Sequence, residues 1–360
     1  MVIRHRRPGF MAVAVLSVVA LAGAACSKSS ASPDGADCST PAASPVVTLA
    51  AYSNVYDTYG KLISSFQSDW KDKHNDQSVQ FLTSFGGSTT QAQAVVNGLQ
   101  ADIVALSLDP DVQTIQDAGL ITHDWKKDPN GSIVATGAVV FDVRKGNPKH
   151  IHDWSDLTQP GLNILTPDPA QSGGAKWNIV AAYGAAMRGK VPGYKANDPA
   201  DAERLLQGIF ANVTVLDKSA NDSLKDFDGG NGDVAINYDY AVQADSATKD
   251  GTNEMVVPPS TVAIQTPTVV VDKNAKAHCV QGIANAFVNY LRTPDAQDLF
   301  QTVGLERPID VKAAQKGTDD EPAVQDYFTT DDIGGWDQLE KDTVFGPDGA
   351  FTKAYKAAQG

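Results

Sequence analysis

Two short glycine turns are the segments of this sequence best suited to bind a charged ligand. Gly86-Gly87-Ser88 and Ser172-Gly173-Gly174 each follow an apolar, β-branched run and precede apolar residues at helical spacing. The first turn of a helix has backbone N–H groups without partners and a partial positive charge, and glycine lets an anion approach the backbone closely. The turns therefore predict an anion site built from uncharged donors, although each turn alone could be a plain tight loop.

Other residues around these turns strengthen the prediction of helix starts. Ser88 and Gln91 have the spacing of a capping box. A third helix start is predicted at Ser219-Ala220-Asn221, directly after a strand expected at residues 213–216. If two halves of the protein face each other, three helix N-termini can converge on one anion.

Motifs of common hydrolases and metalloenzymes are absent from the sequence. It contains no Gly-x-Ser-x-Gly, no His-Glu-x-x-His and no phosphate-loop lysine motif. His150 and His152 lie beside Asp153, but this spacing in a loop is more typical of exposed residues than of metal ligands. We therefore expect a binding protein that is not an enzyme and has no catalytic residues, metal or cofactor. An anchored envelope hydrolase is the alternative from another class.

The elements that must position the turns alternate between strands and helices. This alternation predicts an α/β fold with mainly parallel sheets flanked by helices. A chain of 360 residues exceeds what one hydrophobic core usually supports, which predicts two lobes. The expected strands are residues 46–49, 79–82, 102–106, 133–143, 162–165, 213–216, 233–237 and 268–271.

Two of the apolar runs are candidates for carrying the chain between the lobes. They lie around residues 133–143 and 233–240. The expected boundaries are then 46–137 for the first part of lobe 1 and 138–237 for lobe 2. Residues 238–360 would complete lobe 1 and add C-terminal helices.

The N-terminal segment predicts export and lipidation. Three arginines precede an apolar run from residue 11 to residue 25, as in a secretory signal, and the run is too short to span a bilayer stably. Small residues before Cys26 predict that residues 1–25 are a signal peptide and that Cys26 becomes the lipidated first residue. An ordinary cleaved signal peptide that leaves Cys26 free is the alternative. Residues 27–45, rich in Ser, Ala and Pro, predict a flexible tether.

Charge and cysteine content limit the possible partners. Beyond Cys26 the sequence has only Cys38 and Cys279, which could form a disulfide in an oxidising compartment. The formal net charge of −14 makes nucleic acid and anionic lipid surfaces poor partners.

Longer stretches that include the glycine turns are similar to the sequences of a known family. They are residues 86–106, 143–149 and 153–178, followed by shorter stretches along nearly all of the chain after the tether. On these residues the chain resembles the sulfate-binding proteins of bacterial sulfate/thiosulfate ABC importers, and its lipid-anchored form resembles the actinobacterial SubI type. The resemblance implies the two-lobed type II periplasmic binding protein fold, with the ligand in the cleft between the lobes.

The resemblance also implies the location and the partners of the protein. It would be a monomer, lipid-anchored to the extracytoplasmic face of the cell membrane, and would deliver sulfate or thiosulfate to the permease subunits of an ABC importer. Molybdate and tungstate are alternative cargoes, because both are fully ionised at neutral pH.

The implied ligand contacts are backbone N–H groups and hydroxyls. Sulfate has no proton to give at neutral pH, so donors alone satisfy it, whereas phosphate brings a proton that needs an acceptor. This chain departs from the family at two positions: it has Ser53-Asn54 where many members have Asp-Pro, and Tyr238 where the family has tryptophan. The phenol of Tyr238 can accept as well as donate. The candidate ligand-binding residues are Ser53, Gly87, Ser88, Ser172, Gly173, Gly174, Ala220, Asn221 and Tyr238.

Overall fold

The computed structural model describes residue 38 and residues 44–317 and 322–359 of the chain. The expected signal peptide, Cys26 and most of the expected tether lie outside the described residues. In the described part, no helix combines the length and the apolar character needed to cross a membrane.

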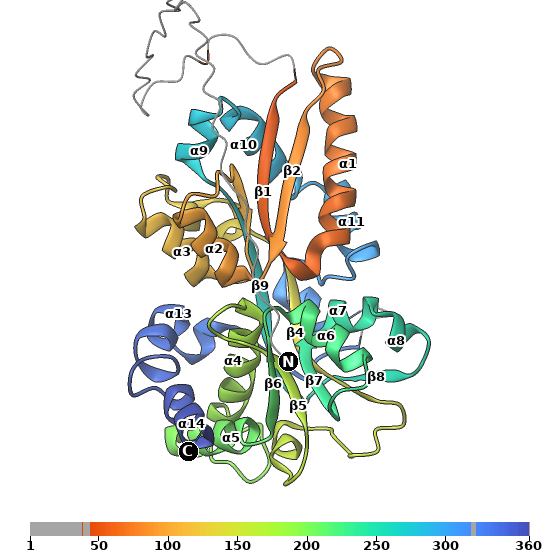
Figure 1. Cartoon of the computed structure of the whole chain (residues 1–360), viewed down its shortest axis with the longest axis vertical. Coiled ribbons are helices and arrows are strands. Elements are labelled where there is room, and N and C mark those ends of the chain that lie inside the picture. The colour runs from red at the N-terminus through yellow and green to blue at the C-terminus, as the bar shows by residue number, and fades with distance from the viewer. Residues whose placement is uncertain (1–37, 39–43, 318–321, 360) are drawn as a thin grey trace, which may run out of the picture. The chain divides into compact units, whose positions relative to one another are not determined.

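Strands and helices alternate to build two lobes, which share one sheet with the strand order β2-β1-β3-β9-β4-β7-β5-β6 (Figure 1). In lobe 1, β1 (Val46–Tyr52) pairs in parallel with both β2 (Gln80–Gly86) and β3 (Ile103–Ala105). The helices of this lobe are α1 (Tyr56–Lys73), α2 (Ser88–Val96), α3 (Asp109–Asp117), α9 (Asp272–Ala277), α10 (Gln281–Tyr290) and α11 (Pro294–Thr302).

Lobe 2 is built around a second parallel set of strands. In this set β5 (Ile164–Pro167) lies between β6 (Val213–Asp217) and β7 (Val234–Tyr238). The helices of this lobe are α4 (Gly173–Met187), α5 (Pro199–Phe210), α6 (Ala220–Asp228), α7 (Asp239–Ala244), α8 (Ser246–Lys249), α13 (Gly335–Gln338) and α14 (Ala350–Gln359).

Two long antiparallel strands connect the lobes. β4 (Ile133–Arg144) pairs with β9 (Ser260–Val270) as far as Ala138, and from Val139 onward it pairs with β7. β9 continues into lobe 1, where it pairs with β3. The remaining elements are β8 (Asn253–Val256), which pairs with β4, β10 (Asp326–Phe328), which pairs with β9, and α12 (Val311–Lys316).

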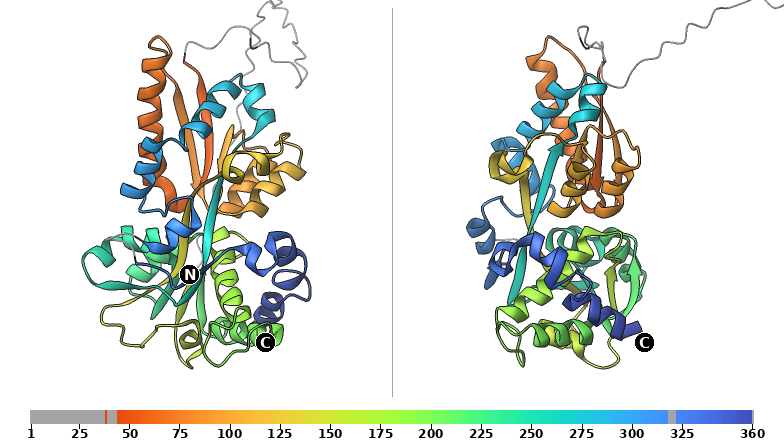
Figure 2. Two further views of the ribbon diagram at one scale, coloured as in Figure 1. Left: turned by 180° about the vertical axis from the view of Figure 1, so that it is seen from behind. Right: turned by 90° about the vertical axis from the view of Figure 1, so that its left-hand side faces the viewer.

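The return of the chain to lobe 1 differs from the expected boundary at residue 238. After β7 the chain stays in lobe 2 through α7, α8 and β8, and it crosses back only along β9. The C-terminal helices also belong to lobe 2, as both views of Figure 2 show. In α14 the rings of Phe351 and Tyr355 pack on Phe210 of α5, with centroids 5.0 and 6.1 Å from it. Hydrophobic spacing predicts a helix but not the surface that its apolar face covers.

Helix α1 shows how the apolar spacing in the sequence becomes packing. Its buried face includes Tyr59, Leu62, Phe66 and Trp70, which recur at helical spacing on one side. The Phe66 ring lies 5.2 Å from that of Phe287 in α10. Each such buried side chain contributes about 1.5–3 kcal/mol to stability.

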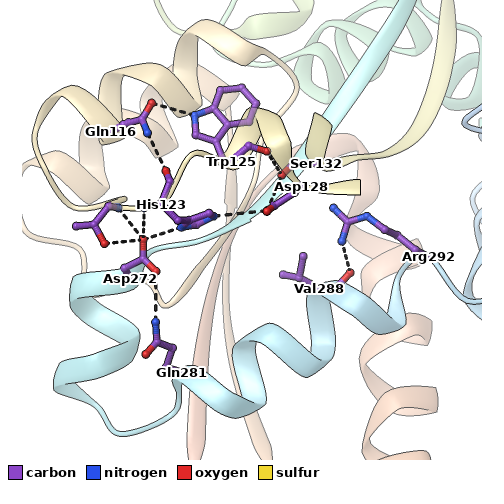
Figure 3. A network of polar contacts seen from close by, with 10 residues as sticks. Gln116, His123, Trp125, Asp128, Ser132, Asp272, Gln281, Val288 and Arg292 are labelled. Carbon is purple, nitrogen blue, oxygen red and sulfur yellow. Dashed lines mark hydrogen bonds and ion pairs between the residues drawn. The ribbon is translucent and has the colours of Figure 1, made fainter. Parts of the chain in front are cut away.

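The end of lobe 1 distant from lobe 2 carries a disulfide between Cys38 and Cys279. Asp272, the first residue of α9, holds the loop that follows α3 (Figure 3). Its Oδ2 accepts from the Thr122 N–H at 2.6 Å and lies 2.7 Å from His123 Nδ1. Burial acts to raise the pKa of Asp272, but the hydrogen bonds from His123 and Thr122 outweigh burial and lower it below the ordinary value.

Candidate functional site

A pocket of about 770 Å³ lies between the two lobes. Lobe 1 lines it with residues after β1 and at the end of β2, and lobe 2 lines it with residues before α4 and at the start of α6. Three of the expected ligand residues, Ser53, Gly87 and Asn221, are among these lining residues. Lys218 and Lys225 also line the pocket, together with Asp57, Asp222 and Asp245, so both signs of charge occur at its wall.

The other expected ligand residues are buried, and the structure brings them together from different elements. A Cβ atom added to Gly174 would lie 2.9 Å from Tyr238 Cε2 and 3.2 Å from the Ala220 Cβ. The start of α4, the start of α6 and the end of β7 therefore meet at Gly174. The buried members of the set are Ser88, Ser172, Gly173, Gly174, Ala220 and Tyr238, together with Gly87, which also lines the pocket.

Gly173 joins this group to lobe 1. A Cβ atom at Gly173 would collide with Ser107 Oγ and would lie 2.8 Å from Leu108 Cγ, both between β3 and α3. Glycine is therefore required at this position for the close approach of the two lobes, as the sequence pattern indicated.

The N-terminus of α2 lacks the capping box that was expected from Ser88 and Gln91. Gly87 is the N-cap, and Ser88 is already the first helical residue. The Ser88 hydroxyl donates to Asp111 Oδ2 at 2.5 Å and accepts from the Ser107 N–H at 3.0 Å. Gln91 bonds to the Ser84 hydroxyl rather than to the N-cap backbone. The capping-box prediction was therefore wrong, and Ser88 offers a ligand its backbone N–H rather than its hydroxyl.

Asp111 is a residue of the site that sequence reasoning missed. It lies in the first turn of α3 and is 2% exposed. Burial raises its pKa to about 6, against the opposing effect of the hydrogen bond from Ser88. Asp111 also accepts from the Thr89 hydroxyl at 3.3 Å, so its role is to hold the first turn of α2. The Asp-Pro-Asp at residues 109–111 was the only signal in the sequence.

Helices α4 and α6 begin where the sequence predicted helix starts. Ser172 is the N-cap of α4, and Ser219 is the N-cap of α6, with its hydroxyl accepting from the Asp222 N–H at 3.1 Å. The Ser172 N–H donates to the Asp168 carbonyl at 2.8 Å, so only its hydroxyl remains for a ligand. The first backbone N–H groups of both helices have no carbonyl partner one turn earlier in their own helix.

Asn237 is a second residue that sequence reasoning missed. It is fully buried in β7, where its Nδ2 donates to the Ala220 carbonyl at 2.8 Å. Its Oδ1 accepts from the Tyr238 N–H at 2.9 Å and from Asn54 Nδ2 at 3.4 Å. Asn237 thereby orients the start of α6 and contacts the residues after β1. A polar residue inside an apolar strand was the available signal.

Tyr238 is buried among aromatic rings. Its ring centroid lies 5.2 Å from that of Tyr240 and 6.1 Å from that of Tyr52. Burial raises the pKa of Tyr238 well above its ordinary value, so the phenol is neutral and can both donate and accept. A Cβ atom at Gly174 would lie 3.2 Å from its hydroxyl, which places the hydroxyl at the start of α4.

Hydrogen bonds across the cleft hold the lobes close together. The Thr90 N–H of α2 donates to the Gln171 carbonyl before α4 at 3.1 Å. The indole of Trp177 in α4 donates to the Ser107 carbonyl at 2.6 Å. The Tyr52 and Tyr240 hydroxyls lie 2.9 Å apart. The groups that the expected ligand residues bring together here are N–H and O–H donors rather than cationic side chains.

Comparison with known proteins identifies the family of the chain and relatives of known cargo. The family model described as bacterial extracellular solute-binding protein matches residues 47–306. A sulfate-binding protein of Synechococcus elongatus is 35% identical, over 99% of this chain and 98% of the relative. A thiosulfate-binding protein of Escherichia coli is 31% identical, over 86% of this chain and 91% of the relative. The structure of the sulfate-binding protein SubI from Mycobacterium tuberculosis H37Rv superposes with a TM-score of 0.72 and 31% identity, covering 83% of this chain and 99% of that one.

Proposed function

Because this chain belongs to the family of bacterial extracellular solute-binding proteins, we propose that it binds sulfate and delivers it to the permease subunits of an ABC importer. The protein is a carrier without enzymatic activity, and it acts as a monomer on the extracytoplasmic face of the cell membrane. Cys26 carries the lipid anchor. The observation that supports this function best is the close approach of three helix starts: the start of α6 meets the start of α4 at Gly174, and Gly87, the N-cap of α2, packs against the backbone of Gln171 and Lys218 just before α4 and α6.

The donors are neutral, and each has a defined origin. The backbone N–H groups of Ser88, Gly173, Gly174 and Ala220 come from the three helix starts, and the hydroxyls of Ser172 and Tyr238 add side-chain donors. A hydrogen bond to a charged group contributes about 1.5–3 kcal/mol. Six such bonds offset the dehydration of a dianion and leave affinity in the micromolar range, which corresponds to about −8 kcal/mol. Ser53, Gly87 and Asn221 border the route by which the ligand enters.

Thiosulfate is the second candidate cargo. Its support is the 31% identity to a thiosulfate-binding protein over nearly the whole chain. Thiosulfate is a dianion in which one oxygen of sulfate is replaced by sulfur, so the same donors serve the other oxygens. Molybdate and tungstate are larger than sulfate. The same donors would bind them only where the space available to the ligand is large enough.

Isothermal titration calorimetry of the secreted chain tests the proposal. Sulfate, thiosulfate, molybdate and phosphate are titrated separately at neutral pH into protein that has been dialysed free of anions. We expect micromolar binding of sulfate. No binding of any of the four anions would overturn the proposal and reopen an enzymatic or adhesive function.

A further inference from the structure

Two buried hydroxyl groups, those of Ser107 and Tyr238, lie beside the first turn of α4, where the lobes meet. Ser107 is fully buried, and its hydroxyl has no hydrogen-bond partner within the described residues. Ser107 packs against Gly173 and Tyr238 against Gly174, the next residue, so the two hydroxyls lie close together without a hydrogen bond of ordinary geometry, and Ser107 acts to lower the pKa of Tyr238 against the effect of burial. A buried hydroxyl without a partner is costly to the folded protein. The arrangement therefore suggests a function for Ser107 besides packing.

Both hydroxyls border the proposed anion donors. Ser107 Oγ lies so close to Gly173 that a Cβ atom added to this glycine would collide with it. Tyr238 Oη lies 3.2 Å from the position of a Cβ atom added to Gly174. The two glycines supply backbone N–H groups of the first turn of α4. An anion held by these N–H groups would thus lie within reach of the hydroxyls.

Hydroxyls differ chemically from the other groups of this site. A backbone N–H can only donate, whereas a hydroxyl donates one hydrogen bond and accepts others. With sulfate, Ser107 can donate to Tyr238 and Tyr238 can donate to the anion. With a protonated anion the order reverses: the anion donates to Tyr238, and Tyr238 donates to Ser107, whose oxygen is free to accept.

We propose that the Ser107–Tyr238 pair makes this site able to accept a proton from its ligand, so that the protein binds singly protonated tetrahedral oxyanions such as hydrogen phosphate as well as sulfate. This inference rests on the proposed function, because it assumes that the oxyanion lies at the start of α4. A site made of donors alone would leave the ligand proton unpaired and would reject these anions.

Asp111 is the rival acceptor, because it is the buried carboxylate nearest to the first turn of α2. Its Oδ2 already accepts from the Ser88 and Thr89 hydroxyls, at 2.5 and 3.3 Å. These contacts direct the carboxylate toward its own lobe. The pair of hydroxyls faces the opposite glycines, which favours it over Asp111 as the acceptor.

Calorimetry with sulfate and with hydrogen phosphate at pH 8 tests the inference on the secreted chain. Ser107→Ala should weaken hydrogen phosphate binding about 5- to 150-fold, because the Tyr238 proton then has no acceptor, and should change sulfate binding less than about fivefold. Ser223→Ala is the matched control, since Ser223 in α6 is another fully buried serine whose hydroxyl forms no hydrogen bond of ordinary geometry within the described residues, and it does not contact Gly173 or Gly174. It should leave both affinities unchanged.

Two further variants and the wild-type result make the outcome decisive. Tyr238→Phe should weaken hydrogen phosphate more than sulfate, and it serves as the second variant if Ser107→Ala does not fold. Sulfate binding by the wild-type protein without measurable hydrogen phosphate binding would overturn the inference and leave the proposed function intact. Loss of hydrogen phosphate binding in Asp111→Asn, with no effect of Ser107→Ala, would assign the acceptor to Asp111 instead. Failure to bind either anion would refute both the inference and the proposed function.

Discussion

Replacing Gly173 by alanine should abolish tight sulfate binding while leaving the protein folded. The new Cβ would collide with Ser107 Oγ and lie 2.8 Å from Leu108 Cγ, whereas ordinary contacts begin at 3.4 Å. The lobes must therefore separate by roughly 1 Å or more, which is enough to break hydrogen bonds whose usual length is about 2.9 Å. Alanine is favoured over glycine in a helix, so α4 itself should remain formed.

The size of the effect follows from the donors that are lost. If the anion loses two charge-assisted hydrogen bonds, each of about 1.5–3 kcal/mol, binding weakens by about 3–6 kcal/mol. At about 1.4 kcal/mol per factor of ten, the dissociation constant rises about 10²- to 10⁴-fold. Gly173→Asp should be at least as severe, because it adds a negative charge beside the anion.

Calorimetry and thermal unfolding measure this prediction together. The variant should melt near the wild-type temperature without ligand and should lose the stabilisation that sulfate gives the wild type. Gly60→Ala in α1 is the control, because a Cβ at Gly60 meets no atom within 4 Å. A sulfate affinity of Gly173→Ala close to that of the wild type would refute the proposed closure at this glycine.

Three further predictions concern stability, each measured by chemical denaturation. The double variant Cys38→Ser/Cys279→Ser removes the disulfide and should lower the free energy of unfolding by about 2–4 kcal/mol; no change would mean that the bridge does not constrain the unfolded chain. Asp272→Asn should destabilise the protein at pH 7, and the difference should vanish as the pH falls through the lowered pKa of Asp272, below about pH 4; a constant difference down to pH 3 would contradict this. Asp239→Asn removes the carboxylate that pairs with the buried Arg307 and should cost about 3–5 kcal/mol, whereas an unchanged midpoint would mean that this ion pair contributes nothing to stability.

The glycine turns illustrate what could be predicted from the sequence. A glycine before a helical pattern indicates a helix start and a backbone that other groups can approach closely. The structure has helix starts at Ser88, Gly173 and Ala220. The α/β class followed from the alternation of β-branched and helical stretches. These signals are local, so a sequence alone displays them.

The contacts between elements that are distant in the sequence could not be predicted in the same way. The fold brings Ser107 and Asp111 to Ser88 at the start of α2. It likewise brings Asn237 of β7 to Ala220 at the start of α6. Their residue types are common in loops and caps, and the spacing of the surrounding residues does not indicate a partner that is distant in the sequence. The capping box at Ser88 failed for the same reason, because a carboxylate from another helix competes for the serine hydroxyl.

Strand β9 shows a further limit of sequence patterns. Only residues 268–271 were expected to be a strand, whereas the structure begins the strand at Ser260. Pro267 interrupts the pattern and normally argues against a central strand. In the structure it lies where β9 changes partner from β4 to β3, so its missing N–H falls at the crossing between the lobes.

A crystal structure of the protein with selenate tests the central claim most directly, because selenate has the shape and charge of sulfate and its selenium atom can be located by anomalous scattering. The account predicts one selenate between the lobes, with its oxygens about 2.7–3.1 Å from the backbone nitrogens of Gly173, Gly174 and Ala220. Selenate bound instead at Lys218 and Lys225 on the pocket wall, with those three nitrogens out of contact, would contradict it.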